Sequence, residues 1–168
     1  MTGITNAFLR KVKIALFTVA LAVGFRLGEA FGLNWTELDL QSGTLAVARQ
    51  LQRVKGKLTF IEPKTRNARR SIPLHAFAVE ALQELRRQRQ QLQDMPFAGD
   101  KWTNHGLVFT SGIGTPADPR NVARTLTAFL KANKLPKIQF HDLRHSCATL
   151  LLSQGTDPRT IMQTLGHS

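Results

Sequence analysis

The spacing of apolar residues changes twice along this sequence, and those changes limit the folds it can adopt. Apolar residues recur at helical spacing over 7–24 and again over 75–93, as on one face of a buried helix. Between 44 and 74 the runs TLAVARQL, KLTFIEP and ARRSIPL are short and β-prone, and turn-like KGK and KTRN separate them. We therefore predict one α+β domain over residues 1–168. It would be mainly helical, with a small three-stranded antiparallel sheet arranged as a meander.

Local signals predict where the other helices begin and end. Gly24 is a plausible stop for the first helix, and RLGEAFGL then opens a second helix near Phe25 or Arg26. Asp-Pro occurs at 118–119 and at 157–158, where the aspartate can cap a helix and the proline can take its first position. The further elements predicted are helices over about 119–133, 141–154 and 158–166, and a short strand or extended piece at 107–110.

The charge of the chain points to a polyanionic partner. There are 23 Lys and Arg against 11 Asp and Glu, a formal charge of +12, and such a surplus is typical of proteins that bind nucleic acid. The longest apolar run, at 14–25, is too short to cross a bilayer. No A-x-A-like cleavage site follows it, so a secretory signal is not favoured. The single cysteine excludes an internal disulfide framework and fits a reducing, cytoplasmic compartment.

Much of this charge lies in the predicted sheet. The segment 49–70 holds eight basic residues against one acid, Glu62. A charged sheet edge that discourages aggregation is one interpretation. A phosphate-facing sheet explains the excess better, and we favour it. The predicted DNA contacts are Arg49, Arg53, Lys55, Lys57, Arg66, Arg69 and Arg70.

The segment QFHDLRHSCATLLL at 139–152 contains the most distinctive chemistry. His141 and Arg144 are three residues apart on a predicted helix, so both project from one face. Leu143, Cys147 and Leu150 recur at helical spacing on a neighbouring stripe. This pattern suits a buried helix that presents an imidazole and a guanidinium to a cleft.

Other candidate residues have ordinary explanations when each is taken alone. Arg26 can be a surface cation paired with Glu29, Lys64 a solvated hairpin lysine, and His167 part of a frayed end. These residues and the His141 segment lie in four separate stretches of the sequence, and the order of the four stretches is informative. These are GFRLGEAFGLNWTELDL at 24–40, PKTRNARRSIPL at 63–74, HDLRHSCATLL at 141–151 and LSQGTDPRTIMQTLGHS at 152–168.

In these stretches the chain resembles the catalytic domain of the tyrosine recombinases, the phage integrase family. The resemblance begins near residue 14 and implies that family's fold and its site-specific DNA recombination or integration. It also implies a role for each matching position. The catalytic positions would be Arg26, Lys64, His141, Arg144 and His167, and Glu29 would orient the Arg26 guanidinium.

These residue types suit the implied reaction. A phosphodiester under attack gathers negative charge on its non-bridging oxygens, which two guanidiniums can hold with paired hydrogen bonds. A lysine can protonate the leaving 5′-oxygen, and imidazoles can orient the phosphate or assist proton transfer. The arginines supply positive charge, and no cluster of acids suited to Mg²⁺ is apparent, so we expect neither a metal nor another cofactor.

The sequence departs from the family pattern in two places. It contains no tyrosine, whereas the family's nucleophile is a tyrosine shortly after the LGH motif. We also expect these residues to lack the family's N-terminal core-binding domain. Nothing in the pattern would activate Ser146 or Ser153 as a substitute. We therefore expect no covalent cleavage by this chain alone, although another protomer can supply a tyrosine in some family members.

The expected function is thus the catalytic portion of a recombinase that acts through a 3′-phosphotyrosyl intermediate. Its partners would be double-stranded DNA and other recombinase protomers, without a membrane, in a bacterium, phage or mobile element. One alternative is a non-catalytic DNA-binding fragment or inhibitor that keeps the phosphate pocket. Another is an unrelated basic helical regulator that reads the major groove, although it gives Arg26, Lys64 and the HxxR pair no reason to converge.

Overall fold

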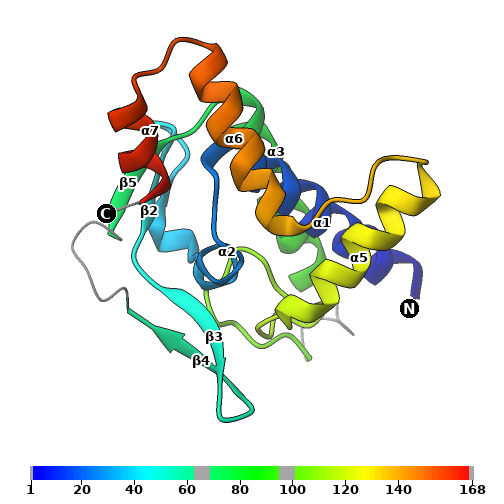
Figure 1. Ribbon diagram of the computed structural model, residues 1–168. Helices are drawn as coiled ribbons and strands as arrows, with labels where there is room; N and C mark the ends of the chain where they lie inside the picture. The colour runs from blue at the N-terminus through cyan, green and yellow to red at the C-terminus, as the bar shows by residue number, and fades with distance from the viewer. Residues whose placement is uncertain (1, 63–68, 95–100, 167–168) are drawn as a thin grey trace.

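The computed structural model describes residues 2–62, 69–94 and 101–166 of the chain (Figure 1). Its helices are α1 (Thr2–Val23), α2 (Leu27–Gly32), the short 3-10 helix η1 (Trp35–Glu37), α3 (Ala76–Gln93), α5 (Pro119–Ala132), α6 (Phe140–Ser153) and α7 (Pro158–Leu165). Its strands are β1 (Leu38–Asp39), β2 (Thr44–Val47), β3 (Gln50–Val54), β4 (Lys57–Ile61) and β5 (Arg70–Pro73). The predicted fold class, mainly helical with small antiparallel sheets, is confirmed.

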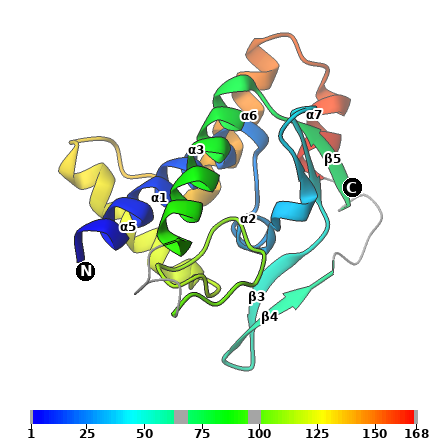
Figure 2. The ribbon, with the colours of Figure 1, turned by 180° about the vertical axis from the view of Figure 1, so that it is seen from behind.

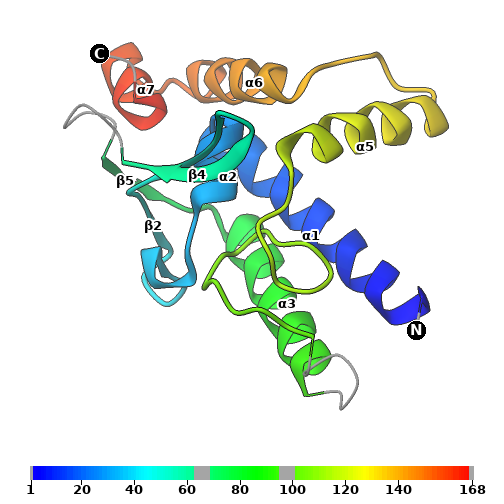
Figure 3. The same ribbon diagram turned by 90° about the horizontal axis from the view of Figure 1, so that it is seen from below.

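Helix α1 forms the centre of the hydrophobic core. It lies between α3 and α6 (Figure 3), and its residues Val19, Ala20 and Val23 are completely buried. Phe17 of α1 meets Phe140 of α6 with ring centroids 6.4 Å apart. This burial explains the long apolar run, and within the three described ranges no helix is long and apolar enough to cross a membrane.

The strands pair differently from the predicted meander. Strands β1, β2 and β5 form one antiparallel sheet, in which Leu45 pairs with Ile72 and both side chains are buried. Strands β3 and β4 form a separate hairpin that projects from the body of the molecule (Figure 2). Its two-residue turn, Lys55-Gly56, has positive φ at both positions, the backbone that matches the twist of a hairpin.

The meander prediction is wrong because the run TLAVARQL does not stay in one sheet. At Arg49 the chain passes against α2, where Arg49 Nε donates a hydrogen bond to the carbonyl of Gly32 at 2.9 Å. A Cβ on Gly32 would lie 2.7 Å from the carbonyl oxygen of Arg49. This close approach redirects the chain into β3 and leaves β2 free to pair with β5. The stretch 107–110, predicted as a short strand or an extended piece, forms isolated β-bridges at its two ends.

The predicted stops of α1 and α7 and the predicted starts of α5 and α7 are confirmed, because they depend on local interactions. Helix α1 begins at Thr2, five residues before its predicted start at residue 7. Gly24 adopts a φ of 66° and ends α1, and Gly166 adopts a φ of 68° and ends α7. The side chains of Asp118 and Asp157 each accept a hydrogen bond from a backbone N–H in the first turn of α5 and α7, at 3.0 Å in both cases. These ends place the beginning of α2, the beginning of α6 and the end of α7 beside one another.

Candidate phosphate-binding site

Arg26 immediately precedes α2 and is paired with Glu29, as the sequence predicts. Its Nη1 lies 3.1 Å from Glu29 Oε1, and its backbone N–H donates to Glu29 Oε2 at 2.9 Å. The carboxylate is therefore fixed at the positive end of the short helix. The Arg26 side chain remains 42% exposed, so its guanidinium is oriented and still open to a ligand.

Glu29 also binds a second arginine, which the sequence interpretation placed elsewhere. Arg70 of β5 donates from Nη1 and Nη2 to the two carboxylate oxygens, at 3.1 and 3.0 Å. Both side chains are buried, with 7% and 5% exposed. Burial alone would raise the pKa of Glu29, but hydrogen bonds and positive charge from Arg70, together with Arg26, outweigh it and hold the pKa below its ordinary value. Arg70 was expected to face DNA, and instead it faces the interior.

The end of α7 is held by three arginines. Three consecutive carbonyls there each accept a hydrogen bond from a different guanidinium. The pairs are Arg70 Nε to Thr164 O at 2.6 Å, Arg144 Nη2 to Leu165 O at 2.5 Å and Arg26 Nη2 to Gly166 O at 3.2 Å. The last carbonyls of a helix lack intrahelical partners and carry partial negative charge, which cations stabilise. Three guanidiniums therefore lie close together at the end of α7, and two of them, those of Arg26 and Arg70, also bind the Glu29 carboxylate.

Arg144 lies deeper than the HxxR pattern suggests. Only 3% of it is exposed, and its Nη1 donates to the carbonyl of Gly24 at 2.6 Å. Burial, reinforced by the charges of Arg26 and Arg70, lowers its pKa to about 10, so it stays protonated at neutral pH. His141, one turn earlier on α6, is exposed. The two residues share a helix, but Arg144 faces the α1–α2 junction and His141 faces solvent.

A cavity of about 450 Å³ joins His141 to Arg26. Helices α2, α5 and α6 line it together with the segment that precedes α6. Its polar lining residues are Arg26, Thr127, Lys137, Gln139 and His141. The beginning of α6 also borders the cavity, through Phe140 and His141. The cavity therefore has the size and the positive groups to hold one phosphate.

Three of the predicted site residues, Lys64, Arg66 and His167, lie outside the described residues. The described neighbours of His167 are nevertheless positioned, because Gly166 accepts the hydrogen bond from Arg26. Strand β5 begins six residues after Lys64 and holds Arg70 against Glu29.

The remaining basic candidates lie on the hairpin and near it. Lys55 and Lys57 are exposed on the β3–β4 turn. Arg53 pairs with Asp118 at 2.9 Å, which joins the hairpin to the beginning of α5. Arg49 is partly buried against Gly32 and the ring of Phe60, and Arg69 is an exposed partner of Glu62. The exposed cations of this group thus continue toward α5. This helix and the residues just after it add exposed cations that were not predicted from the sequence, namely Arg120, Arg124 and Lys131 on α5 and Lys134 after it.

Two features of the site went unrecognised in the sequence. Lys137 lines the cavity, and its position just before HDLR was a usable signal. The inward role of Arg70 had no local signal, because its carboxylate partner lies 41 residues earlier. The sequence of a basic segment does not show which of its arginine or lysine side chains is buried.

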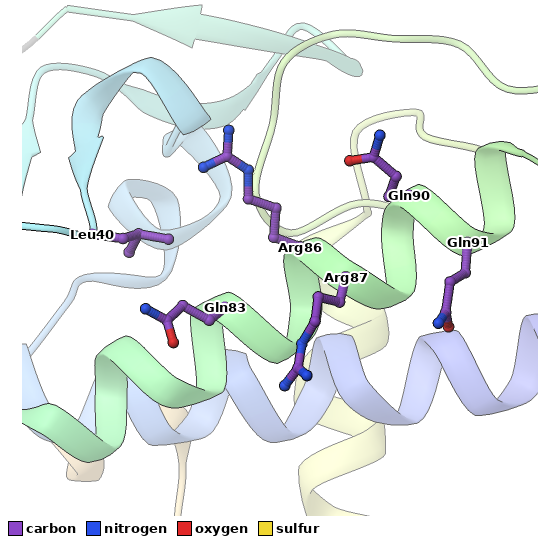
Figure 4. Close-up of a pocket in the computed structure, with 6 residues that line it drawn as sticks. All are labelled: Leu40, Gln83, Arg86, Arg87, Gln90 and Gln91. Atoms are coloured by element: carbon purple, nitrogen blue, oxygen red, sulfur yellow. The ribbon is translucent and has the colours of Figure 1, made fainter.

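A larger cavity of about 740 Å³ lies along α3, but its charged side chains do not point toward one another as those around the Arg26 cavity do. Figure 4 shows its side chains spreading from the helix, with Arg86 and Arg87 pointing in different directions. Arg87 pairs with Glu84 of the same helix at 2.7 Å, and Arg86 lies over the ring of Trp35. Within the part of the chain that the structure describes, no group of three or more His, Cys, Asp or Glu could hold a metal ion.

Comparison with known proteins finds similarity to one family along nearly the whole chain. The family model described as "Phage integrase family" matches residues 4–168. A "Tyrosine recombinase XerC-like" protein of Caldanaerobacter subterraneus subsp. tengcongensis is 36% identical over 166 residues, which cover 92% of this chain and 42% of that protein. An "Integrase" of Streptomyces ambofaciens is 34% identical over 170 residues, which cover 92% and 41%. The chain therefore spans less than half the length of these two relatives.

Solved structures share the fold at lower identity. The Tn1549 transposon integrase, in complex with transposon right end DNA, superposes with a TM-score of 0.80 at 22% identity, covering 100% of this chain and 57% of that one. XerA recombinase superposes with a TM-score of 0.69, also at 22% identity, covering 100% and 53%. These likenesses show the fold.

Proposed function

Because the chain belongs to the phage integrase family, we propose that it is the catalytic portion of a tyrosine site-specific recombinase. That recombinase would break and rejoin DNA strands through a phosphotyrosine intermediate. One observation carries the proposal: the Arg26 guanidinium is held by Glu29 and Gly166 and opens into the same cavity as His141. A preorganised cation beside an imidazole is what a phosphodiester under attack requires.

Each described residue has a defined part in this proposal. Arg26 binds the non-bridging oxygens of the phosphate, and His141 orients that phosphate or moves a proton at the attacking oxygen. Arg144 is buried, and its positive charge acts on Arg26 without needing exposure. The three guanidiniums of Arg26, Arg70 and Arg144 outnumber the single carboxylate of Glu29, so the cluster attracts an anion.

The remaining steps are assigned to residues outside the described ranges. Lys64 would protonate the leaving 5′-oxygen, and His167 would assist at the phosphate. The 168 residues contain no tyrosine, so the nucleophile of the proposed reaction has to come from outside them. The arginines would provide the charge stabilisation, and the proposal includes no metal or other cofactor.

The proposed partner is double-stranded DNA. Arg53, Lys55 and Lys57 on the hairpin and the exposed cations of α5 would contact phosphates on either side of the cavity. We also propose that further recombinase protomers assemble on the same DNA. A non-catalytic protein that keeps the phosphate pocket and binds DNA without cleaving it is the second candidate.

Binding to a duplex tests the DNA proposal. We expect log Kobs to fall with log salt concentration with a slope of about −5 or steeper, for six or more phosphate contacts. Arg26→Ala should weaken binding about tenfold, because it removes charge-assisted hydrogen bonds to one phosphate. Arg87→Ala is the control, since Arg87 is an exposed arginine with its own carboxylate partner on α3. Salt-insensitive binding, or equal losses in both variants, would contradict the proposed pocket.

A further inference from the structure

Arg70 connects the three segments on which the proposed site depends. It belongs to β5, it holds the Glu29 carboxylate that orients Arg26, and it donates to the carbonyl of Thr164 near the end of α7. We propose that Arg70 is a positioning residue. It fixes the Arg26 guanidinium and the end of α7 relative to each other and does not itself contact DNA. This inference rests on the proposed function only for the identity of the bound phosphate.

The hydrogen bonds of Glu29 show how the positioning works. Oε1 accepts from Arg70 Nη1 and Arg26 Nη1, both at 3.1 Å. Oε2 accepts from Arg70 Nη2 at 3.0 Å and from the backbone N–H of Arg26 at 2.9 Å. Each carboxylate oxygen of Glu29 thus accepts one hydrogen bond from Arg26 and one from Arg70. A rotation of the carboxylate plane would break bonds to both arginines, so the orientation of Arg26 depends on Arg70.

Gly166 provides a second and independent observation. It ends α7 with a φ of 68°, and a Cβ there would lie 2.8 Å from Arg70 Nη1 and 3.1 Å from its Cζ. The carbonyl of the same residue accepts a hydrogen bond from Arg26 at 3.2 Å. The Arg70 guanidinium is therefore packed directly against the residue that holds Arg26. A side chain at 166 would displace Arg70 without removing any charge.

Lysine is unsuited to the place of Arg70. A guanidinium donates two parallel hydrogen bonds from a planar fork and a third from Nε, whereas an ammonium is a compact point charge. Arg70→Lys keeps the charge and loses the geometry. It therefore separates positioning from simple attraction of DNA, because a charge-only role would survive this substitution.

The test uses the 168-residue chain with 15N-labelled arginine. Guanidinium signals of Arg26, Arg70, Arg144 and Arg89 are assigned by single substitutions and compared among wild type, Arg70→Lys, Gly166→Ala and Arg87→Lys. Arg89 is the internal reference for folding, because it is buried elsewhere and binds Leu107 O at 2.9 Å and Asn104 Oδ1 at 2.8 Å. Arg87→Lys is the matched control, since it alters an exposed arginine–glutamate pair. Affinity for a duplex is measured alongside.

We expect Arg70→Lys and Gly166→Ala to shift the Arg26 signal and leave the Arg89 signal in place. Duplex affinity should fall about tenfold, the loss expected for a misplaced bidentate phosphate contact. Arg87→Lys should change neither the Arg26 signal nor the affinity beyond about twofold, as for an exposed pair. If Arg70→Lys also disturbs Arg89, the result is decided by whether Gly166→Ala shifts the Arg70 and Arg26 signals together. Backbone strain at residue 166 that acts only through its own carbonyl moves the Arg26 signal alone.

An unchanged Arg26 signal in Arg70→Lys and Gly166→Ala would overturn the positioning role. A loss of affinity in Arg70→Lys without that signal change would also overturn it, because Arg70 would then act on DNA directly. If the wild-type chain binds no duplex and the Arg26 signal still responds to Arg70, the DNA proposal fails and the positioning role stands. The two claims therefore fail through different measurements.

Discussion

Arg144 donates a hydrogen bond to the carbonyl of Gly24 at 2.6 Å, although 120 residues separate them. This bond joins α6 to the turn that leads into Arg26. The other Nη of Arg144 donates to Leu165 O at 2.5 Å, so one buried guanidinium connects the end of α1, the HxxR helix and the end of α7. The geometry of the site is consequently part of the stability of the fold.

Arg144→Ala should therefore lower the free energy of unfolding substantially. The substitution leaves two buried carbonyls without their charged donor and opens a void beside Cys147. We expect a loss of about 3 kcal/mol, from charged hydrogen bonds worth about 1.5–3 kcal/mol each. Urea unfolding monitored by circular dichroism measures it. Arg159→Ala, at an exposed position of α7, should stay within about 0.5 kcal/mol of wild type, and an equal loss there would contradict the structural role of Arg144.

Glu29 should make stability depend on acid. The pKa of Glu29 in the folded chain lies below its ordinary value. Its contribution to stability is therefore complete above that ordinary pKa and is lost as the pH falls through the lowered pKa of the folded chain. Glu29→Gln removes this contribution and leaves Arg70 buried without its carboxylate, at a cost of about 3–5 kcal/mol near neutral pH.

Urea unfolding of wild type and Glu29→Gln over a pH series provides the measurement. The difference between the two free energies of unfolding should be largest near neutral pH and should shrink below about pH 4, where the unfolded carboxyl is protonated. A difference that stays constant across the series would show that the Glu29 charge does not stabilise the fold.

Gly24→Ala tests the close packing of α7 against the end of α1. Gly24 has a φ of 66°, and a Cβ there would clash with the side chain of Leu165. Gly155 has a φ of 78° with no atom within 4 Å of a Cβ, so Gly155→Ala carries the backbone strain alone. We expect a loss of about 1 kcal/mol for Gly155→Ala, and about 1–3 kcal/mol more for Gly24→Ala. Thermal unfolding compares them, and equal losses would mean that Leu165 does not press on Gly24.

The hairpin should contribute to the salt dependence of DNA binding. Lys55 and Lys57 are exposed on the β3–β4 turn, and each phosphate contact adds about 0.9 to the slope of log Kobs against log salt concentration. A Lys55→Ala, Lys57→Ala double variant should therefore reduce that slope by about 2. An unchanged slope in a fluorescence-anisotropy titration would indicate that the hairpin faces away from DNA.

Sequence reasoning succeeded where interactions are local. The Asp-Pro caps and the glycines that end α1 and α7 act within one turn, and the Arg26–Glu29 pair spans a single turn, so each was predictable. The strand order was not, because β3 leaves the sheet where Arg49 meets Gly32, a contact between distant segments. The burial of Arg70 and Arg144 was not predictable either, because both side chains donate hydrogen bonds to carbonyls at the end of α7. Those carbonyls belong to Thr164 and Leu165, which lie far from Arg70 in the sequence.

Covalent attachment to DNA tests the central claim most directly. A longer form of the protein, with a tyrosine downstream of Ser168, is incubated with a pool of nicked duplexes that trap a cleaved intermediate, beside the 168-residue chain and an Arg26→Ala variant of the longer form. We predict a 3′-phosphotyrosyl adduct with the longer form, none with the 168 residues, and a loss of about 100-fold in rate for Arg26→Ala, as for removal of one preorganised donor. An Arg26→Ala variant that forms the adduct as fast as its parent, or a tyrosine-bearing form that yields no adduct, would contradict the account.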